Sequence, residues 1–301
     1  MNFSPFAWHH LRGKTPADWE VSRFSMEDRA GRLEFANREG LKATVSWEPC
    51  EREPDRLTTM STFLANNILG KQRARERNLR VTDVHTEEVG LFIMGWLDER
   101  LPLQALAYDA KGKHLIRWVF EGLTAPAKRR SVVIPVLTAF DFNDDPDTCE
   151  YDLFGIHAVL PRQYRIEDIA TFPARTMMAF EGDRSKARIT FRRWGLARFH
   201  LEKQSLEQFY RSAVRGNGID WISSTPCTVS SHEGLLIRYS APREHHSDRF
   251  MARCWKNGQA YVWLDRAENR IYAYEQMGPD GYPVLPLADT IPGAKPSVPL
   301  S

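Results

Sequence analysis

Apolar and polar residues alternate along many short stretches of the chain, as is typical of half-buried β-strands. Residues 32–36 and 41–47 alternate in this way, and the Asn-Arg-Glu-Gly between them is typical of a turn, so they are predicted to form an antiparallel hairpin. Its inward side is expected to carry Leu33, Phe35, Leu41, Ala43, Val45 and Trp47. Four further strands are predicted at residues 79–85, 90–96, 103–108 and 114–120.

The spacing of apolar residues becomes helical between Glu51 and Gly70, which predicts one amphipathic helix that ends at Gly70. This order of elements returns in the second half of the chain, with a predicted hairpin at 176–180 and 187–193 and a helix at 201–214. Corresponding apolar positions lie 145 to 146 residues apart, among them Pro16 and Pro161, Trp19 and Tyr164, Leu33 and Met178, Phe35 and Phe180, and Phe63 and Phe209. We therefore predict an α+β fold made of two tandem repeats, each an antiparallel β-sheet packed against one or two α-helices.

A chain of 301 residues is long enough for two domains of ordinary size. The acidic, proline-containing stretch at 143–147 has no apolar period and predicts the boundary between them. The expected organisation is a first domain at 1–146, a second, homologous domain at 147–285, and an extended, proline-rich tail at 286–301.

The order of elements in each half resembles the PsbP-like and DcrB-like α/β fold. The residues that carry the resemblance are Pro16, Trp19, Phe63, Gly90, Gly112 and the segment Leu137-Thr138-Ala139-Phe140, with Pro161, Tyr164, Phe209, Gly234 and Gly258 in the second half. Members of that fold group look like binding modules, such as photosystem assembly factors, GTPase-binding proteins and secretion-effector chaperones. The resemblance implies docking of a partner and transfers no catalytic residue.

The net charge and the cysteines of the chain limit the classes of function that fit it. Lysine and arginine number 41 against 39 acidic residues, so the formal charge of +2 provides no overall field that would recruit nucleic acid or an anionic membrane. No apolar stretch approaches the ~18 residues of a membrane span, which predicts a cytoplasmic protein. The cysteines form no CxxC pair, so free thiols are expected, and neither a metal nor a cofactor.

Two alternatives to a binding module rest on particular residues. A metal- or thiol-dependent enzyme could use His232, His245 and Cys254, because imidazole and thiolate serve as ligands, bases and nucleophiles. The second alternative is a phosphate or nucleic-acid binder through the strand Arg188–Arg198, where several arginines surround Trp194. On that strand, residues 188, 190, 192 and 194 share one face, for which the simpler interpretation is a solvated surface.

Exposed aromatic and arginine side chains often anchor a protein partner. The candidate partner-binding residues are Trp8, Trp19, Trp194, Arg192, Arg193, Arg198 and Trp255. The sequence thus favours a non-enzymatic adaptor or chaperone-like module that docks a protein or peptide in or near a groove between its two repeats.

Overall fold

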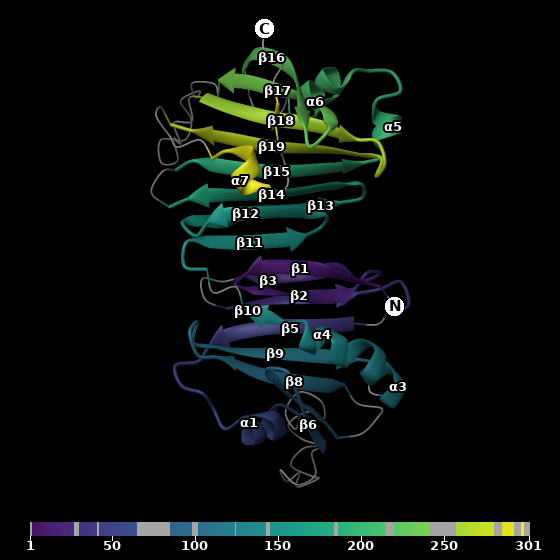
Figure 1. Ribbon diagram of the computed structural model, residues 1–301, viewed down its shortest axis with the longest axis vertical. Coiled ribbons are helices and arrows are strands. Elements are labelled where there is room, and N and C mark those ends of the chain that lie inside the picture. The colour runs from purple at the N-terminus through teal and green to yellow at the C-terminus, as the bar shows by residue number, and fades with distance from the viewer. Residues whose placement is uncertain are drawn as a thin grey trace, which may run out of the picture. The chain divides into compact units, whose positions relative to one another are not determined.

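The protein is described by a computed structural model that covers residues 2–26, 30–40, 42–64, 85–97, 102–123, 125–142, 145–183, 186–214, 220–240, 257–279, 285–291 and 296–297. The chain divides into two compact units, Met1–Asp144 and Asp145–Ser301. Of the described residues, 59% lie in strands and 16% in helices, and the strands form three antiparallel sheets. Figure 1 shows the elements of each unit.

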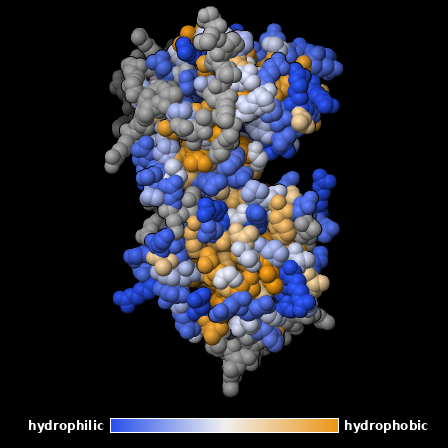
Figure 2. Space-filling model, viewed as in Figure 1, coloured by the Kyte–Doolittle hydropathy of each residue, from blue (hydrophilic) through white to orange (hydrophobic). Residues whose placement is uncertain are grey.

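The first unit contains a seven-stranded sheet with the order β3-β4-β5-β9-β8-β7-β6. Its strands are β3 (Glu20–Met26), β4 (Gly31–Ala36), β5 (Lys42–Pro49), β6 (His85–Val89), β7 (Phe92–Trp96), β8 (Leu103–Asp109) and β9 (His114–Glu121). The helices are α1 (Arg56–Phe63), α3 (Pro126–Lys128) and α4 (Ile134–Thr138), with a π-helical segment at Arg129–Val133. Figure 2 shows hydrophobic residues at the surface of this unit around α4.

The predicted hairpin of the first unit is confirmed by the pairing of β4 with β5. Leu33 lies opposite Val45 and Phe35 lies opposite Ala43, and all four side chains are buried. The alternation of apolar residues succeeds here because one face of the sheet packs into the core.

A further hairpin in this unit joins β1 (Phe3–His9) to β2 (Leu11–Pro16), and β10 (Asp141–Phe142) pairs with β2. Phe6 of β1 makes edge-to-face contacts with Phe35 and Trp118, with ring centroids 5.3 and 6.2 Å apart. The apolar face of the seven-stranded sheet is therefore covered in part by strands.

The second unit contains an eight-stranded sheet with the order β13-β14-β15-β19-β18-β17-β16-β20. Its strands are β13 (Tyr164–Phe172), β14 (Arg175–Gly182), β15 (Arg188–Gly195), β16 (Asp220–Val229), β17 (His232–Ser240), β18 (Asn257–Asp265), β19 (Arg270–Gly278) and β20 (Pro296–Ser297). The hairpin of β11 (Thr148–Leu153) and β12 (Ile156–Pro161) precedes them, and the helices are α5 (Ala197–His200), α6 (Leu206–Val214) and α7 (Leu287–Thr290).

The two faces of the eight-stranded sheet are covered differently. Phe209, Tyr210 and Val214 of α6 pack on one face, in a core that includes Trp194 and Ile237. On the other face, Tyr151 of β11 contacts Phe180 at 4.8 Å, and the hydroxyl of Tyr274 in β19 donates to Thr290 Oγ1 of α7 at 3.1 Å.

The predicted fold class, an α+β fold in two tandem repeats, is wrong. The described residues are predominantly strand, and the strands form three sheets instead of one sheet in each of two repeats. Helices do occur in both predicted helical segments: α6 spans 9 residues, and the described part of the first segment contains α1 with 8. Strands, and not only helices, cover the faces of the large sheets. The hairpins β1–β2 and β11–β12 pack aromatic side chains against them.

Parts of the sequence-based assignment fall on residues that the structure does not describe, namely the end of the first helix at Gly70, most of the strand at 79–85 and a strand at 250–255. Within the described ranges, no helix is long and apolar enough to cross a membrane. Of the cysteines, Cys50, Cys149 and Cys227 are free thiols.

Candidate functional site

A half-open cavity of about 220 Å³ lies in the second unit. Its apolar wall is formed by Ile156, Phe191, Trp263, Tyr272, Ala273 and Ile291, and polar residues join the lining at His157, Arg192, Asp265 and Glu268. The visible face of this unit exposes hydrophobic residues around α7, the helix that directly precedes Ile291 (Figure 2). A cavity with apolar walls and a few polar groups is the usual form of a binding site.

Two strands supply the aromatic part of the wall. Trp263 of β18 lies directly opposite Tyr272 of β19, and their rings stack with centroids 5.4 Å apart at an interplanar angle of 14°. Trp263 is 9% exposed, so most of its ring is held in place by neighbouring side chains. The wall is therefore preformed, because directly opposed aromatic pairs are rigid components of antiparallel sheets.

The turn between β11 and β12 forms another side of the cavity. Phe154 and Gly155 both have positive φ, at 57° and 68°, which is the conformation of a type I′ turn. A Cβ atom at Gly155 would collide with Nη1 of Arg193. Glycine is thus favoured here by the backbone conformation, and a larger residue would displace the Arg193 guanidinium packed against it.

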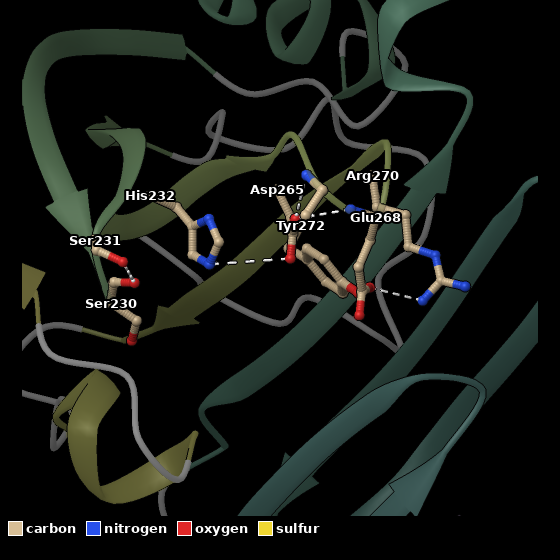
Figure 3. Close-up of polar contacts among 8 residues, drawn as sticks. Ser230, Ser231, His232, Asp265, Glu268, Arg270 and Tyr272 are labelled. Atoms are coloured by element: carbon tan, nitrogen blue, oxygen red, sulfur yellow. Dashed lines mark hydrogen bonds and ion pairs between the residues drawn. The ribbon is translucent and has the colours of Figure 1, made fainter.

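Asp265, one of the residues that line the cavity, faces a histidine of the neighbouring strand. Figure 3 shows His232 of β17 and Asp265 of β18 pointing toward one another, with Nε2 and Oδ2 3.9 Å apart. The other oxygen of Asp265, Oδ1, accepts hydrogen bonds of 2.9 Å from the backbone N–H groups of Ala267 and Glu268. Asp265 therefore holds the β18–β19 turn as well as facing the histidine.

A second polar group lies on the same turn. Glu268 Oε2 accepts hydrogen bonds from Tyr272 at 2.7 Å and from Arg270 at 2.8 Å, as Figure 3 shows. Burial raises the pKa of Tyr272, so this hydroxyl stays protonated and donates a hydrogen bond to the glutamate. The charge of Glu268 is already matched by Arg270, which leaves no free carboxylate charge at this point of the rim.

These contacts define what the cavity can do chemically. The apolar wall favours an apolar or aromatic group, and the paired side chains at the rim can exchange hydrogen bonds with a polar neighbour of that group. Within the described part of the chain, no group of three His, Cys, Asp or Glu side chains is arranged to hold a metal ion.

The tryptophans predicted to bind a partner lie in the cores. Trp8 is fully buried in the first unit, Trp19 is 8% exposed, and Trp194 packs against Phe209 of α6 with centroids 5.5 Å apart. Trp255 lies outside the described residues. Each described tryptophan of the set thus contributes to packing within its own unit.

The predicted arginines occupy three different environments. Arg192 lines the cavity and is mostly buried, with Nε donating to Glu275 Oε1 at 2.7 Å. Arg193 packs against Gly155 at the edge of the cavity, and Arg198 is exposed on α5. Of these arginines, Arg193 directs its guanidinium to the cavity side, whereas the guanidinium of Arg192 lies on the α6 face of the sheet with Glu275 and Tyr210.

The strand Arg188–Arg198 does not present a solvated face. Thr190 and Trp194 are buried, Arg192 pairs with Glu275, and Arg188 forms an ion pair of 3.2 Å with Glu167. The expectation of a solvated surface at these positions is wrong, because α6 covers this side of the sheet.

The enzyme alternative is represented among the described residues by His232 alone, since His245 and Cys254 lie outside them. Cys227, which directly follows Pro226 in β16, is buried, and burial raises the pKa of its thiol to about 11. A thiol with so high a pKa is a poor nucleophile at neutral pH.

Sequence reasoning missed Asp265, Glu268 and Tyr272. The turn Asp265-Arg-Ala-Glu-Asn-Arg270 carried a usable signal, because Asp and Asn are typical of tight turns and aromatic residues flank it on both strands. The turn of β11 and β12 could not be placed at the cavity from sequence, since more than a hundred residues separate it from β18.

No protein-family model and no curated protein matches the sequence. The resemblance to the PsbP-like and DcrB-like fold is not tested by these comparisons and stays a prediction.

Proposed function

We propose that the protein is a non-enzymatic binding module, and that the cavity of the second unit takes one apolar, ring-sized side chain of a protein or peptide partner. The observation that supports this proposal most directly is the cavity volume of about 220 Å³. An apolar cavity of about 150 Å³ is large enough for benzene, so this one has room for a phenylalanine-sized group.

The chemistry of the walls supports an uncharged occupant. Trp263, Phe191 and Ile156 offer apolar surface, whereas the carboxylate of Glu268 is matched by Arg270 and that of Asp265 by two backbone N–H groups. An anionic group placed here would lose its hydration and lie beside the carboxylates of Asp265 and Glu268. A partner side chain anchored in such a pocket is the typical energetic centre of a protein interface.

The proposal can be tested with a single amino-acid probe, N-acetyl-phenylalaninamide, titrated into the full chain labelled at its isoleucine methyl groups. We expect saturable NMR shifts of the Ile156 methyl signal, and much smaller shifts with N-acetyl-alaninamide. The variant Ile291→Trp should abolish the saturable shift, because an indole at the edge of the cavity fills it.

The matched control is Ile222→Trp, which adds the same ring at a position that is 62% exposed and does not line the cavity. This variant should bind the probe as the unmodified protein does. The proposal is overturned if the Ile156 signal does not saturate, or if Ile291→Trp leaves the shift intact.

A further inference from the structure

Three large apolar side chains are exposed at one end of the eight-stranded sheet. Phe172 is 55% exposed, Leu196 57% and Phe199 72%. We call these residues the apolar ledge. Single exposed apolar side chains are common, but a group of them at one end of a sheet is typical of a site of protein interaction.

Hydrogen bonds hold the parts of the ledge next to one another. Phe172 ends β13, and in the turn that leads from it into β14 the backbone oxygen of Ala174 accepts a hydrogen bond of 2.7 Å from Gly195 N. Leu196 follows Gly195 directly and precedes α5, which carries Phe199. The ledge thus runs from the β13–β14 turn to α5.

The backbone that presents the ledge is fixed in a left-handed conformation. Leu196 has φ 59° and ψ 39°, and Ala174 has φ 60°. Asn269 secures the segment, because its backbone oxygen accepts from Ala197 N and its Oδ1 accepts from Arg198 N, at 3.0 and 2.8 Å. Glycine or asparagine is favoured at such positions. A leucine at position 196 therefore places an apolar side chain on a strained backbone.

Two guanidinium groups flank the apolar side chains. Arg175 lies over the ring of Phe172, 4.8 Å from its centroid, and Arg198 is exposed between Leu196 and Phe199 in the sequence. Neither forms an ion pair with a carboxylate of the described residues, whereas Arg165, Arg188, Arg211, Arg266 and Arg270 of the same unit do. The ledge therefore offers positive charge beside its apolar surface.

We propose that the apolar ledge binds a short segment of a partner protein in which an aromatic or aliphatic residue is flanked by aspartate or glutamate. The apolar residue of the segment covers Leu196 and Phe199, and its carboxylates pair with Arg175 and Arg198. Complementary charge of this kind sets the choice of partner and its register. The inference rests on the proposed function in taking the second unit as the one that docks a protein partner.

Nucleic acid fits this surface less well. Two arginines of the neighbouring strand, Arg188 and Arg192, are held by Glu167 and Glu275 and so are not free to follow a phosphate backbone. Leu196 is aliphatic and Arg175 lies over the ring of Phe172, so within the ledge a base would have the single ring of Phe199 to stack on. An acidic peptide uses both the apolar surface and the two guanidinium groups.

The test uses fluorescein-labelled pools of short degenerate peptides and the full chain, with fluorescence anisotropy at physiological ionic strength. One pool alternates Asp or Glu with Phe or Leu, a second replaces the acidic residues by lysine, and a third probe is oligo-dT. We expect the acidic pool to bind at least about tenfold more tightly than either of the others, because its carboxylates reach Arg175 and Arg198.

Variants separate this surface from other exposed apolar residues and from the cavity. Leu196→Ser with Phe199→Ser should weaken binding of the acidic pool about tenfold, and Arg175→Glu with Arg198→Glu should make the lysine pool the tighter one. Leu57→Ser with Leu91→Ser, at 43% and 46% exposed positions of the first unit, should change nothing.

The inference is overturned if oligo-dT binds as tightly as the acidic pool, or if the ledge variants bind all pools unchanged. Because Ile291→Trp blocks only the cavity, either proposal can fail while the other stands.

Discussion

Arg192 and Glu275 form an ion pair inside the second unit, with Nε and Oε1 2.7 Å apart and side chains that are 13% and 3% exposed. The same carboxylate oxygen accepts a hydrogen bond of 2.7 Å from the hydroxyl of Tyr210 in α6. The three side chains thus join β15, β19 and α6. A buried carboxylate is tolerated here because two donors satisfy it.

Removal of one partner of this pair should destabilise the unit strongly. Arg192→Met leaves Glu275 buried without its counterion, and we expect the free energy of unfolding to fall by about 3–5 kcal/mol, measured by urea denaturation. The double variant Arg192→Met with Glu275→Leu should lose less than the single one, because it buries no unpaired charge. Arg266→Ala, which breaks a fully solvated pair with Glu233, should change the free energy by less than about 0.5 kcal/mol. Equal losses for the single and double variants would contradict this account.

Stability should fall at alkaline pH because of Tyr210. Burial, together with the nearby charge of Glu275, holds the pKa of Tyr210 well above its ordinary value of 10.0. The folded chain therefore keeps a proton above pH 10 that the unfolded chain has lost. The contribution of this group is fully present below pH 10 and decreases as the pH rises beyond it.

The measurement is the slope of the unfolding free energy against pH, between pH 10 and the onset of alkaline unfolding. Tyr210→Phe should reduce that slope by up to about 1.4 kcal/mol per pH unit, whatever it does to stability at neutral pH. An unchanged slope in the variant would show that other groups dominate the alkaline transition.

The close packing of β17 and β18 should make Gly258 sensitive to substitution. A Cβ atom at this position would overlap the ring of Tyr239, which is buried in the core beneath α6. Gly258→Ala is expected to lower the free energy of unfolding by about 1–3 kcal/mol in urea titrations. Gly195→Ala provides the control, because its Cβ would meet Ala174 Cβ at an ordinary distance of 3.5 Å and should cost less than about 0.5 kcal/mol.

The turn between β16 and β17 should accept a stabilising change. Ser230 and Ser231 have φ values of 48° and 69°, and Val229 pairs with His232, so this is a two-residue turn of type I′. Asn-Gly is favoured in such turns. Ser230→Asn with Ser231→Gly should raise the thermal midpoint and stabilise the protein by about 1 kcal/mol, while binding of N-acetyl-phenylalaninamide at the cavity stays the same. A lower thermal midpoint of the variant would contradict this prediction and would mean that the two serine side chains stabilise the folded state.

Local pattern predicted local pairing well. The hairpins β4–β5 and β14–β15 follow from alternation alone, because in each the apolar side of both strands faces a core. The fold class did not follow, since alternation does not say whether a helix or another hairpin covers a sheet. Phe6 and Tyr151 lie on the hairpins that cover the large sheets, and nothing in their local sequence indicates which sheet they contact.

The candidate site shows the same limit. The sequence predicts arginines and tryptophans at the binding surface because such residues are frequent in interfaces, but Trp194 and Arg192 make internal contacts instead. The cavity depends on three separate segments around Gly155, Trp263 and Ile291, and only the folded chain brings them together.

The pairing of β15 with β19 has a consequence for how the second unit is made. These strands are neighbours in the sheet, with Arg192 opposite Ala273, yet α5, α6 and the strands β16, β17 and β18 lie between them along the chain. During synthesis β15 leaves the ribosome with one hydrogen-bonding edge unoccupied, and that edge is occupied only when β19 follows. An open edge of this kind is a template for association with other chains. The nascent protein is thus most exposed to aggregation in the interval between these two strands, which is when a chaperone would protect it most.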